Sequence, residues 1–179
     1  MPKNSRKTYY WDSCAFIAWL DGGKGHPAEV IAGLGEIAKE VTENKANLCT
    51  SVITEPEILK GKLTTDQTTR FENLFKRRNV IQINMDSRIA KKASEIRDHY
   101  NSRGVKISTP DSIHLATAII YQVDEFDTLD GAGERPRRND LLPLNGDVAG
   151  YPLHIRIPTG QPTLFSGVEV STEEQEGGN

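Results

Sequence analysis

Short apolar runs alternate with longer amphipathic stretches along this 179-residue chain, and no other feature restricts its fold as strongly. The runs have the length and composition of strands and lie at 8–11, 47–52, 79–84, 125–129 and 153–157. Strands that alternate with helices normally form a parallel sheet that is covered on both faces. The sequence therefore predicts an α/β fold of three layers, in which helices flank a central parallel sheet of four to five strands.

The stretches between these runs carry apolar residues at spacings of three and four, which is the period of a helix with one buried face. Helices are expected over 13–20, 26–44 and 87–100, around Glu57, after Thr64 or Thr65, and from 109 onward. In the last of these, Thr109 is the expected cap, Pro110 the first helical residue and Asp111 an acid of the first turn. Gly33 and Gly35 should weaken the second helix without breaking it.

The length suits one domain with a hydrophobic core and is short for two. We expect this domain to span 1–158, followed by a tail over 159–179 that turns acidic and glycine-rich and is disordered beyond about 166. No apolar run approaches the ~20 residues needed to cross a bilayer, and the N-terminus lacks the apolar core of a signal peptide. These features predict a cytoplasmic protein without a membrane association.

The net charge of −3 argues against a protein that coats nucleic acid through bulk electrostatics, but it does not exclude a nuclease. Basic residues gather in two runs, 76–78 and 135–138, and each is either a solvated face or a contact for phosphates beside an acidic centre. Cys14 and Cys49 are predicted to be small buried thiols. The four histidines are scattered, so the sequence has no Cys/His spacing of the kind that binds zinc.

Four acidic residues each lie at the edge of an apolar run: Asp12, Glu57, Asp111 and Asp130. Acids at strand ends and helix starts can meet at one end of a parallel sheet, where open α/β folds place their ligand sites. Such carboxylates repel one another unless a hard divalent cation neutralises them, so the pattern predicts a site for Mg²⁺ or Mn²⁺. Metal-assisted phosphoryl chemistry with one or two ions is the expected activity. Taken singly, each acid could equally be a cap, a first-turn charge or a turn residue.

Other features near these acids allow more than one interpretation. His114 follows Asp111 by three residues and could assist the site or contact RNA, although a partly buried structural histidine fits as well. The segment GLG at 33–35 resembles part of a dinucleotide fingerprint, but it sits inside a helical stripe instead of following a strand. A phosphatase of the haloacid-dehalogenase type is excluded by spacing, because Asp127 and Asp130 lie too far apart and too late in the chain.

The segments that contain the four acids resemble, in the same order along the chain, the sequence blocks of PIN-domain ribonucleases. They are WDSCAFIAWL, TSVITEPEILKG, STPDSIHLATAI and FDTLD. The similarity spans roughly residues 8–158, and the compact form is similar to VapC-type toxins of prokaryotic toxin–antitoxin pairs. Through this resemblance the acids of the family fall on Asp12, Glu57 and Asp111, and its Thr-x-Asp element falls on Thr128 and Asp130.

The resemblance implies a Rossmann-like PIN fold, Mg²⁺ or Mn²⁺ as the cofactor, and hydrolysis of single-stranded or structured RNA to products with 5′-phosphates. In that scheme the four acids bind the metal, while Ser13, Thr128 and Asp127 lie behind them and orient them. Members of the family commonly form homodimers, and toxins of this type are silenced by a cognate antitoxin. An endoribonuclease toxin is therefore the favoured interpretation.

Two departures from the family pattern leave alternatives open. Glu55 competes with Glu57, although the helical spacing favours Glu57. After Asp130 the family often carries a further acid and an aromatic residue, whereas this chain continues with GAGERPRR, so a second ion could depend on Asp124 or Asp127. The irregular loop expected over 131–150 is also longer than a compact toxin needs.

Three other functions stay possible at this level. The chain could be a non-catalytic PIN-like module that binds RNA or protein, a PIN nuclease outside toxin–antitoxin systems, or a phosphodiesterase that acts on DNA. The presence of all four acids favours an enzyme over the binding module.

Overall fold

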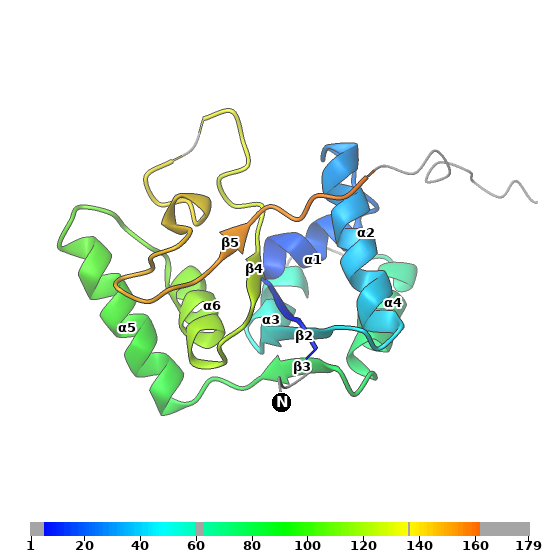
Figure 1. Cartoon of the computed structure of the whole chain (residues 1–179), viewed down its shortest axis with the longest axis horizontal. Helices are drawn as coiled ribbons and strands as arrows, with labels where there is room; N and C mark the ends of the chain where they lie inside the picture. The colour runs from blue at the N-terminus through cyan, green and yellow to red at the C-terminus, as the bar shows by residue number, and fades with distance from the viewer. Residues whose placement is uncertain (1–5, 60–62, 136, 162–179) are drawn as a thin grey trace, which may run out of the picture.

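In a computed structural model of the chain, residues 6–59, 63–135 and 137–161 are described, and the expected disorder beyond about 166 falls outside them. The strands are β1 (Thr8–Trp11), β2 (Asn47–Ser51), β3 (Val80–Ile83), β4 (Glu125–Asp127) and β5 (Ile155–Arg156). They form one parallel sheet in the order β3-β2-β1-β4-β5 (Figure 1). The predicted α/β fold with a central parallel sheet is confirmed, and each predicted run contains a strand.

Helices cover both faces of the sheet and make the three layers seen in Figure 1. They are α1 (Ser13–Leu20), α2 (Ala28–Thr42), α3 (Thr54–Leu59), α4 (Thr65–Phe75), α5 (Ser87–Asn101) and α6 (Thr109–Ile120). The helices α5 and α6 pack on one face, whereas α1, α2 and α4 pack on the other. No helix within the described ranges is both long and apolar enough to span a membrane.

The central strand β1 shows how the sequence divides the core between the two faces. Successive side chains of a strand point to opposite sides of a sheet. Tyr9 and Trp11 accordingly belong to the hydrophobic cluster under α1 and α2, which also contains Phe16. Tyr10 belongs to the cluster under α5 and α6, where its ring stacks on Phe126 with a centroid distance of 5.0 Å. Both faces of β1 are buried, as expected for a central parallel strand.

Side chains cap the starts of α1, α4, α5 and α6, and one of these caps differs from the prediction. Thr64 caps α4 through a capping box with Gln67, in agreement with one of the two residues proposed from the sequence. The predicted cap of α6 was wrong, because Ser108 and not Thr109 accepts from the Asp111 backbone N. Thr109 and Ser108 are both good capping residues, and the chain places Pro110 in the first turn with either choice. The sequence alone could not separate them.

The segment after β5 crosses α2 at a position where only glycine fits. A Cβ atom on Gly33 would lie 2.5 Å from the Thr159 backbone N and 2.7 Å from the Pro158 backbone C. The Gly160 backbone N then donates to the Glu29 backbone O at 2.8 Å. The helix α2 runs unbroken through Gly33, as predicted, so the GLG segment lies inside a helix, and Gly33 allows the segment after β5 to approach it.

The described residues of the 131–150 segment are irregular, as expected, apart from one short 3₁₀ helix at Leu142–Leu144. The segment nevertheless contributes to the core, because Leu141 and Val148 are 1% and 0% exposed and join the cluster under α5 and α6. Two anchors of this kind fix the path of the loop on either side of the 3₁₀ helix. The loop therefore returns to the edge of the sheet where β1 and β4 end.

Candidate active site

The carboxyl ends of β1, β2 and β4 lie at one edge of the sheet, where the acids predicted from the sequence follow. In the register of β1 and β4, Trp11 stands beside Asp127, so Asp12 and Thr128 come next at the same level. A cavity of about 480 Å³ opens at this edge, and its lining includes all four predicted acids, namely Asp12, Glu57, Asp111 and Asp130. The fold thus brings to one cavity four carboxylates that are far apart in the sequence.

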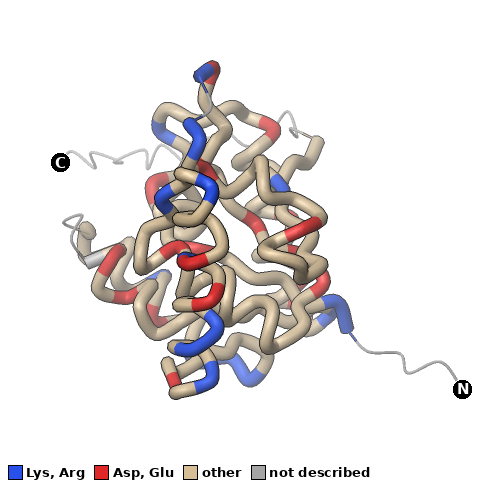
Figure 2. The backbone as a smooth tube through the Cα atoms, turned by 90° about the vertical axis from the view of Figure 1, so that its left-hand side faces the viewer, with Lys and Arg blue, Asp and Glu red and all other residues tan. Residues whose placement is uncertain are grey.

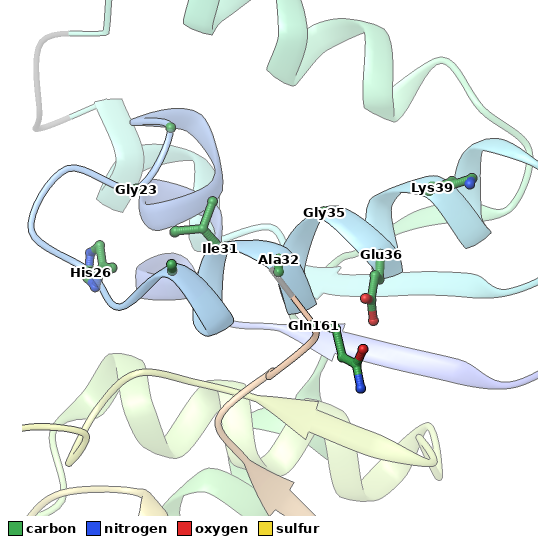
Figure 3. A pocket seen from close by; sticks show the side chains of 10 residues that line it. Gly23, His26, Ile31, Ala32, Gly35, Glu36, Lys39 and Gln161 are labelled. Atoms are coloured by element: carbon green, nitrogen blue, oxygen red, sulfur yellow. The ribbon is translucent and has the colours of Figure 1, made fainter. Parts of the chain in front are cut away.

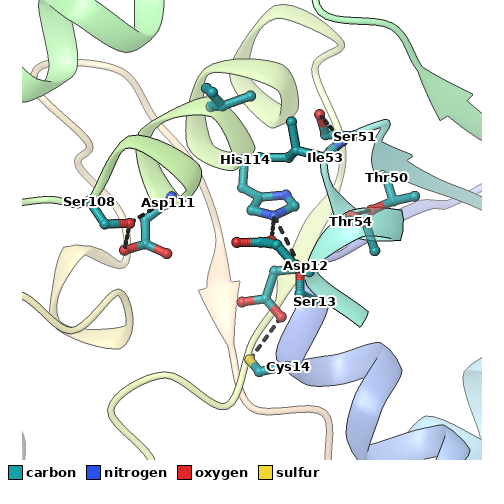
Figure 4. Close-up of polar contacts among 12 residues, drawn as sticks. Asp12, Ser13, Cys14, Thr50, Ser51, Ile53, Thr54, Ser108, Asp111 and His114 are labelled. Carbon is teal, nitrogen blue, oxygen red and sulfur yellow. Dashed lines mark hydrogen bonds and ion pairs between the residues drawn. The ribbon is translucent and has the colours of Figure 1, made fainter. Parts of the chain in front are cut away.

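Asp12 is the most enclosed of these acids, with 5% of its surface exposed. It caps α1, because its Oδ1 accepts from the Ala15 backbone N at 3.0 Å, and the same atom accepts from the Cys14 thiol at 2.9 Å (Figure 4). Its Oδ2 accepts from the Thr128 hydroxyl at 2.5 Å. Burial raises the pKa of Asp12, and the charge of His114 and these hydrogen bonds oppose the shift. The carboxylate is held on both oxygens.

Glu57 enters the cavity from α3, and its Oε2 accepts from donors on two other helices. One donor is the Ser13 hydroxyl at the start of α1, and the other is His114 Nε2 at 3.0 Å (Figure 4). His114 is 2% exposed, so the histidine left open by the sequence is both buried and part of the site. Glu55 is exposed and accepts from Gln82 Nε2 at 3.4 Å, beside a different cavity. The geometry therefore favours Glu57 over Glu55.

Asp111 and Asp130 line the cavity from α6 and from the segment after β4. Asp111 is half-buried and accepts from the Ser108 hydroxyl at 2.5 Å (Figure 4). Burial raises the pKa of Asp130 to about 6, and the charges of Asp140, Asp111 and Asp12 add to the shift in that order. These carboxylates therefore repel one another across the cavity, which is the condition that a bound cation relieves.

Asp140 is a fifth acid of the same cavity, and sequence reasoning missed it. It lies ten residues after Asp130, is 5% exposed, and accepts from the Arg137 backbone N. The chain then returns so that the Leu141 backbone N donates to Asp130 Oδ2 at 3.2 Å. Gly131 permits this return with φ +98°, where a Cβ atom would lie 3.0 Å from Asp140 Cβ. A spacing of ten residues in an irregular loop carries no periodic signal that could have revealed Asp140.

Asp127 is not brought to this cavity, although the sequence placed it behind the acids. Its Oδ2 accepts from Trp11 Nε1 at 3.2 Å, and its Oδ1 accepts from Arg156 Nε at 3.0 Å. Burial raises the pKa of Asp127 to about 7, against the opposing charge of Arg156. Asp127 therefore joins β5 to β4 and β1. Asp124, the other substitute considered, accepts from the Thr8 backbone N at 2.7 Å at the far end of β4.

The expectation that both thiols are buried is correct for Cys49 and wrong for Cys14. Cys14 is half-buried and lines the cavity, where its Sγ donates to Asp12 and accepts from the Leu129 backbone N at 3.1 Å. Burial and the adjacent Asp12 carboxylate raise the pKa of the Cys14 thiol well above its usual range. The thiol keeps its proton and serves as a hydrogen-bond donor to the acid.

The donor set of the cavity fits Mg²⁺ or Mn²⁺, because both cations prefer carboxylate oxygens. In the described part of the chain, no lysine or arginine forms an ion pair with Asp12, Asp111 or Asp130. Among these same residues, no three His, Cys, Asp or Glu side chains stand close enough to hold one metal ion together. The residues therefore match such a cation in chemistry, and its binding requires the carboxylates to draw closer.

A second cavity, of about 730 Å³, runs along α2 and shares His26 with the acidic cavity (Figure 3). Its lining is largely small or apolar, with Gly23, Ile31 and Ala32 on one part, and with Glu36 toward the far end. The two cavities therefore meet where the turn after α1 leads into α2.

The family model of the PIN domain matches residues 9–138. The match covers more than half of the chain and includes all four predicted acids, so the protein belongs to the PIN domain family, whose members are typically nucleases. No curated protein matches this sequence significantly.

Several solved structures with a similar fold come from toxin–antitoxin systems. VapBC2 from Rickettsia felis, bound to a DNA fragment from its promoter, aligns with a TM-score of 0.55 and 13% identity over 83% of this chain and 97% of that chain. A toxin–antitoxin complex from Klebsiella pneumoniae aligns with a TM-score of 0.49 and 21% identity over 74% of this chain and 99% of that chain. VapBC-5 from Mycobacterium tuberculosis aligns with a TM-score of 0.48 and 20% identity over 83% of this chain and 96% of that chain. At these identities the likeness concerns the fold.

Proposed function

We propose that this protein is a divalent-cation-dependent endoribonuclease that hydrolyses phosphodiester bonds of single-stranded or structured RNA. The observation that carries the proposal is the convergence of Asp12, Glu57, Asp111 and Asp130 on one cavity. Membership of the PIN domain family supports it, because these domains are typically nucleases. The proposed setting is the cytoplasm, where the protein acts as the toxin of a toxin–antitoxin pair.

In this proposal Asp12, Glu57, Asp111 and Asp130 hold Mg²⁺ or Mn²⁺. The chemistry that such an ion supplies is neutralisation of the carboxylates, polarisation of the phosphate oxygens and a lowered pKa of a water. Asp140 offers a further carboxylate for a second ion.

The side chains around the acids orient them and contact the substrate. Thr128 and Cys14 hold Asp12, while Ser13 holds Glu57, so two of the acids are aligned before RNA arrives. Basic and acidic residues are interspersed on the side of the molecule seen in Figure 2. Phosphate contacts therefore depend on individual cations, and among the described residues Arg137 is the basic side chain that lines the acidic cavity.

The decisive experiment is cleavage of an RNA pool by purified protein with Mg²⁺ or Mn²⁺, with and without a chelator. We expect cleavage that the chelator abolishes, and a loss of at least about 100-fold in the Asp12→Asn variant, because outer residues of metal sites alone cost 10–100-fold. Asparagine still caps a helix, so this variant should fold. Asp98→Asn, at an exposed position of α5, is the matched control and should retain full activity.

A non-catalytic module that binds RNA or protein is the second candidate, and one observation favours it. No three potential ligands in the described ranges are pre-arranged around a metal ion. Equal inactivity of wild type and Asp12→Asn, combined with RNA binding by both, would support that module. Cleavage of single-stranded DNA in preference to RNA would point to the DNA-directed phosphodiesterase.

The proposal of a cognate antitoxin draws on the fold shared with VapBC2 from Rickettsia felis, and the proposal of a homodimer draws on the resemblance to the PIN family. Co-expression with the product of a small neighbouring open reading frame tests the first, and light scattering of the purified protein tests the second. Failure to form a complex with such a product would favour a PIN nuclease outside toxin–antitoxin systems. A protein that stays monomeric at all concentrations would refute the proposed homodimer.

A further inference from the structure

We propose that His114 is a positioning residue, which the Tyr10 hydroxyl fixes in its Nε2–H form and which then orients the Glu57 carboxylate in the acidic cavity. The proposal rests on the proposed function for the role of Glu57. The chain of hydrogen bonds from Tyr10 to Glu57 stands on its own geometry.

The direction of these hydrogen bonds follows from the atoms involved. An ionised carboxylate has no hydrogen to give, so His114 Nε2 donates to Glu57 Oε2 over 3.0 Å. His114 Nδ1 lies 2.8 Å from the hydroxyl of Tyr10, which is fully buried. The Tyr10 hydroxyl carries a hydrogen that it can donate to Nδ1. Nε2 must carry a hydrogen to donate to Glu57, so this chain of hydrogen bonds defines the Nε2–H form of His114.

The two aromatic rings of this chain have little freedom to turn. The Tyr10 ring stacks on Phe126 at an interplanar angle of 11°, and His114 meets the Tyr10 ring edge-on at 76° with a centroid distance of 5.8 Å. Tyr10 belongs to the central strand β1, and His114 is 2% exposed on α6. The donor to Glu57 is therefore fixed by packed elements, which is the condition for precise placement of a ligand.

Glu57 has need of such a donor because α3 is a helix of only six residues. A helix this short gains little rigidity from its own backbone hydrogen bonds. The contacts from Ser13 and His114 connect it to α1 and α6. A histidine that served only the core would not present a ring nitrogen to a cavity carboxylate.

Nuclear magnetic resonance of the metal-free, full-length protein tests the tautomer directly. Long-range ¹H–¹⁵N spectra distinguish the protonation of the two ring nitrogens, and the signals of His114 are those missing from the His114→Gln variant. We expect the Nε2–H pattern at neutral pH. A ring without a hydrogen on Nε2 overturns the proposal, because such a ring cannot donate to Glu57. The outcome does not depend on RNA cleavage, so it separates this inference from the proposed function.

Binding of Mn²⁺ by calorimetry tests the positioning role, with thermal unfolding measured in parallel. His114→Leu should weaken Mn²⁺ binding by about 10–100-fold, as observed for outer residues of metal sites. His114→Gln keeps an N–H close to the position of Nε2 and should restore most of the affinity. Tyr10→Phe keeps the stacked ring, loses the hydroxyl and should give an intermediate loss.

The matched control is His99→Leu, because His99 lies on α5 beside a different cavity and should leave the affinity unchanged. Equal affinity in wild type and His114→Leu overturns the positioning role, as does a His114→Gln variant that binds as weakly as His114→Leu. A wild type that binds no Mn²⁺ and cleaves no RNA refutes the proposed function, and the tautomer then decides the present inference alone.

Discussion

The acidic cavity has two walls that are built in different ways. The helix wall consists of residues at the starts of α1 and α3 and on α6, namely Asp12, Ser13, Glu57 and His114. The loop wall consists of residues after β4, namely Asp130, Arg137, Asn139 and Asp140. On the helix wall, side chains from separate elements donate to Asp12 and Glu57, in addition to the donors of α1 that Asp12 caps. On the loop wall, the acids accept from backbone N–H groups of their own segment.

This difference separates a pre-arranged part of the site from one that depends on the path of a loop. The donors of the helix wall are anchored in buried strands and helices, so its carboxylates are oriented before any ligand binds. The loop wall is held by a turn around Gly131 and by the packing of Leu141. Thr128 connects the walls, because it donates to Asp12 and accepts from the Asp130 backbone N at 3.0 Å.

The largest effect is expected when one acid of each wall is changed to the isosteric amide. Asp12→Asn should lower cleavage by at least about 100-fold, whereas Asp140→Asn should lower it by at most about 10-fold, because Asp140 accepts from its own loop. The measurement is kcat/KM on one defined RNA. If Asp140→Asn lowers cleavage more than Asp12→Asn does, the acids of the loop wall are the more important ones for cleavage, contrary to our expectation.

Thr128→Val removes the hydroxyl that joins the two walls while it keeps the shape of the side chain. It leaves Asp12 without one donor and the Asp130 backbone N without its acceptor, so we expect a stability loss of about 2 kcal/mol. Cation affinity should fall about 10-fold as well. Chemical denaturation and Mn²⁺ calorimetry measure the two effects. Thr68→Val is the control, because that hydroxyl donates only within α4. Unchanged affinity would mean that Thr128 is structural.

Gly131→Ala tests the loop wall by itself. The new Cβ atom would meet Asp140 and Leu142 at 3.0 and 3.3 Å, on a backbone of φ +98° that disfavours any side chain. We expect a loss of about 1–2 kcal/mol in stability together with reduced cleavage. Gly133→Ala is the control, since nothing lies within 4 Å of its added Cβ. Comparable stability of the two variants would show that the loop relaxes without cost.

Arg137→Ala should have the smallest effect. An exposed guanidinium that contacts a phosphate contributes a fraction of a kcal/mol to about 1 kcal/mol, so KM should rise about two- to fivefold while kcat changes little. The effect should shrink as salt is added. Arg138→Ala is the control, because Arg138 is exposed and outside the cavity lining. Equal KM values for both variants would exclude a specific contact by Arg137.

Much of the fold could be predicted because its signals are local. The strands appear as short apolar runs and the helices as apolar residues three and four apart, and both matched the structure with differences only at the ends. The cap of α6 was missed because Ser108 and Thr109 are both suitable, and only the backbone path selects Ser108. Cys14 was misjudged for a related reason, since its neighbours Thr128 and Leu129 come from the segment after β4.

The site residues divide in the same way. Asp12, Glu57, Asp111 and Asp130 could be proposed because each lies where an element begins or ends, and they line one cavity. Their roles as metal ligands stay a prediction. Asp140 and the chain from Tyr10 to Glu57 had no such signal, because their partners are brought together by loop closure and by strand pairing.

The sequence by itself determined the layered α/β fold and the acids at the strand ends, because hydrophobic period and capping chemistry act between residues close along the chain. Only the tertiary structure decided which side chains contact one another. Asp127 accepts from Arg156, the charge of Asp140 acts on Asp130, and His114 forms a hydrogen bond with Glu57. These contacts depend on the direction of each side chain and on the paths of loops, and neither is encoded in a local pattern.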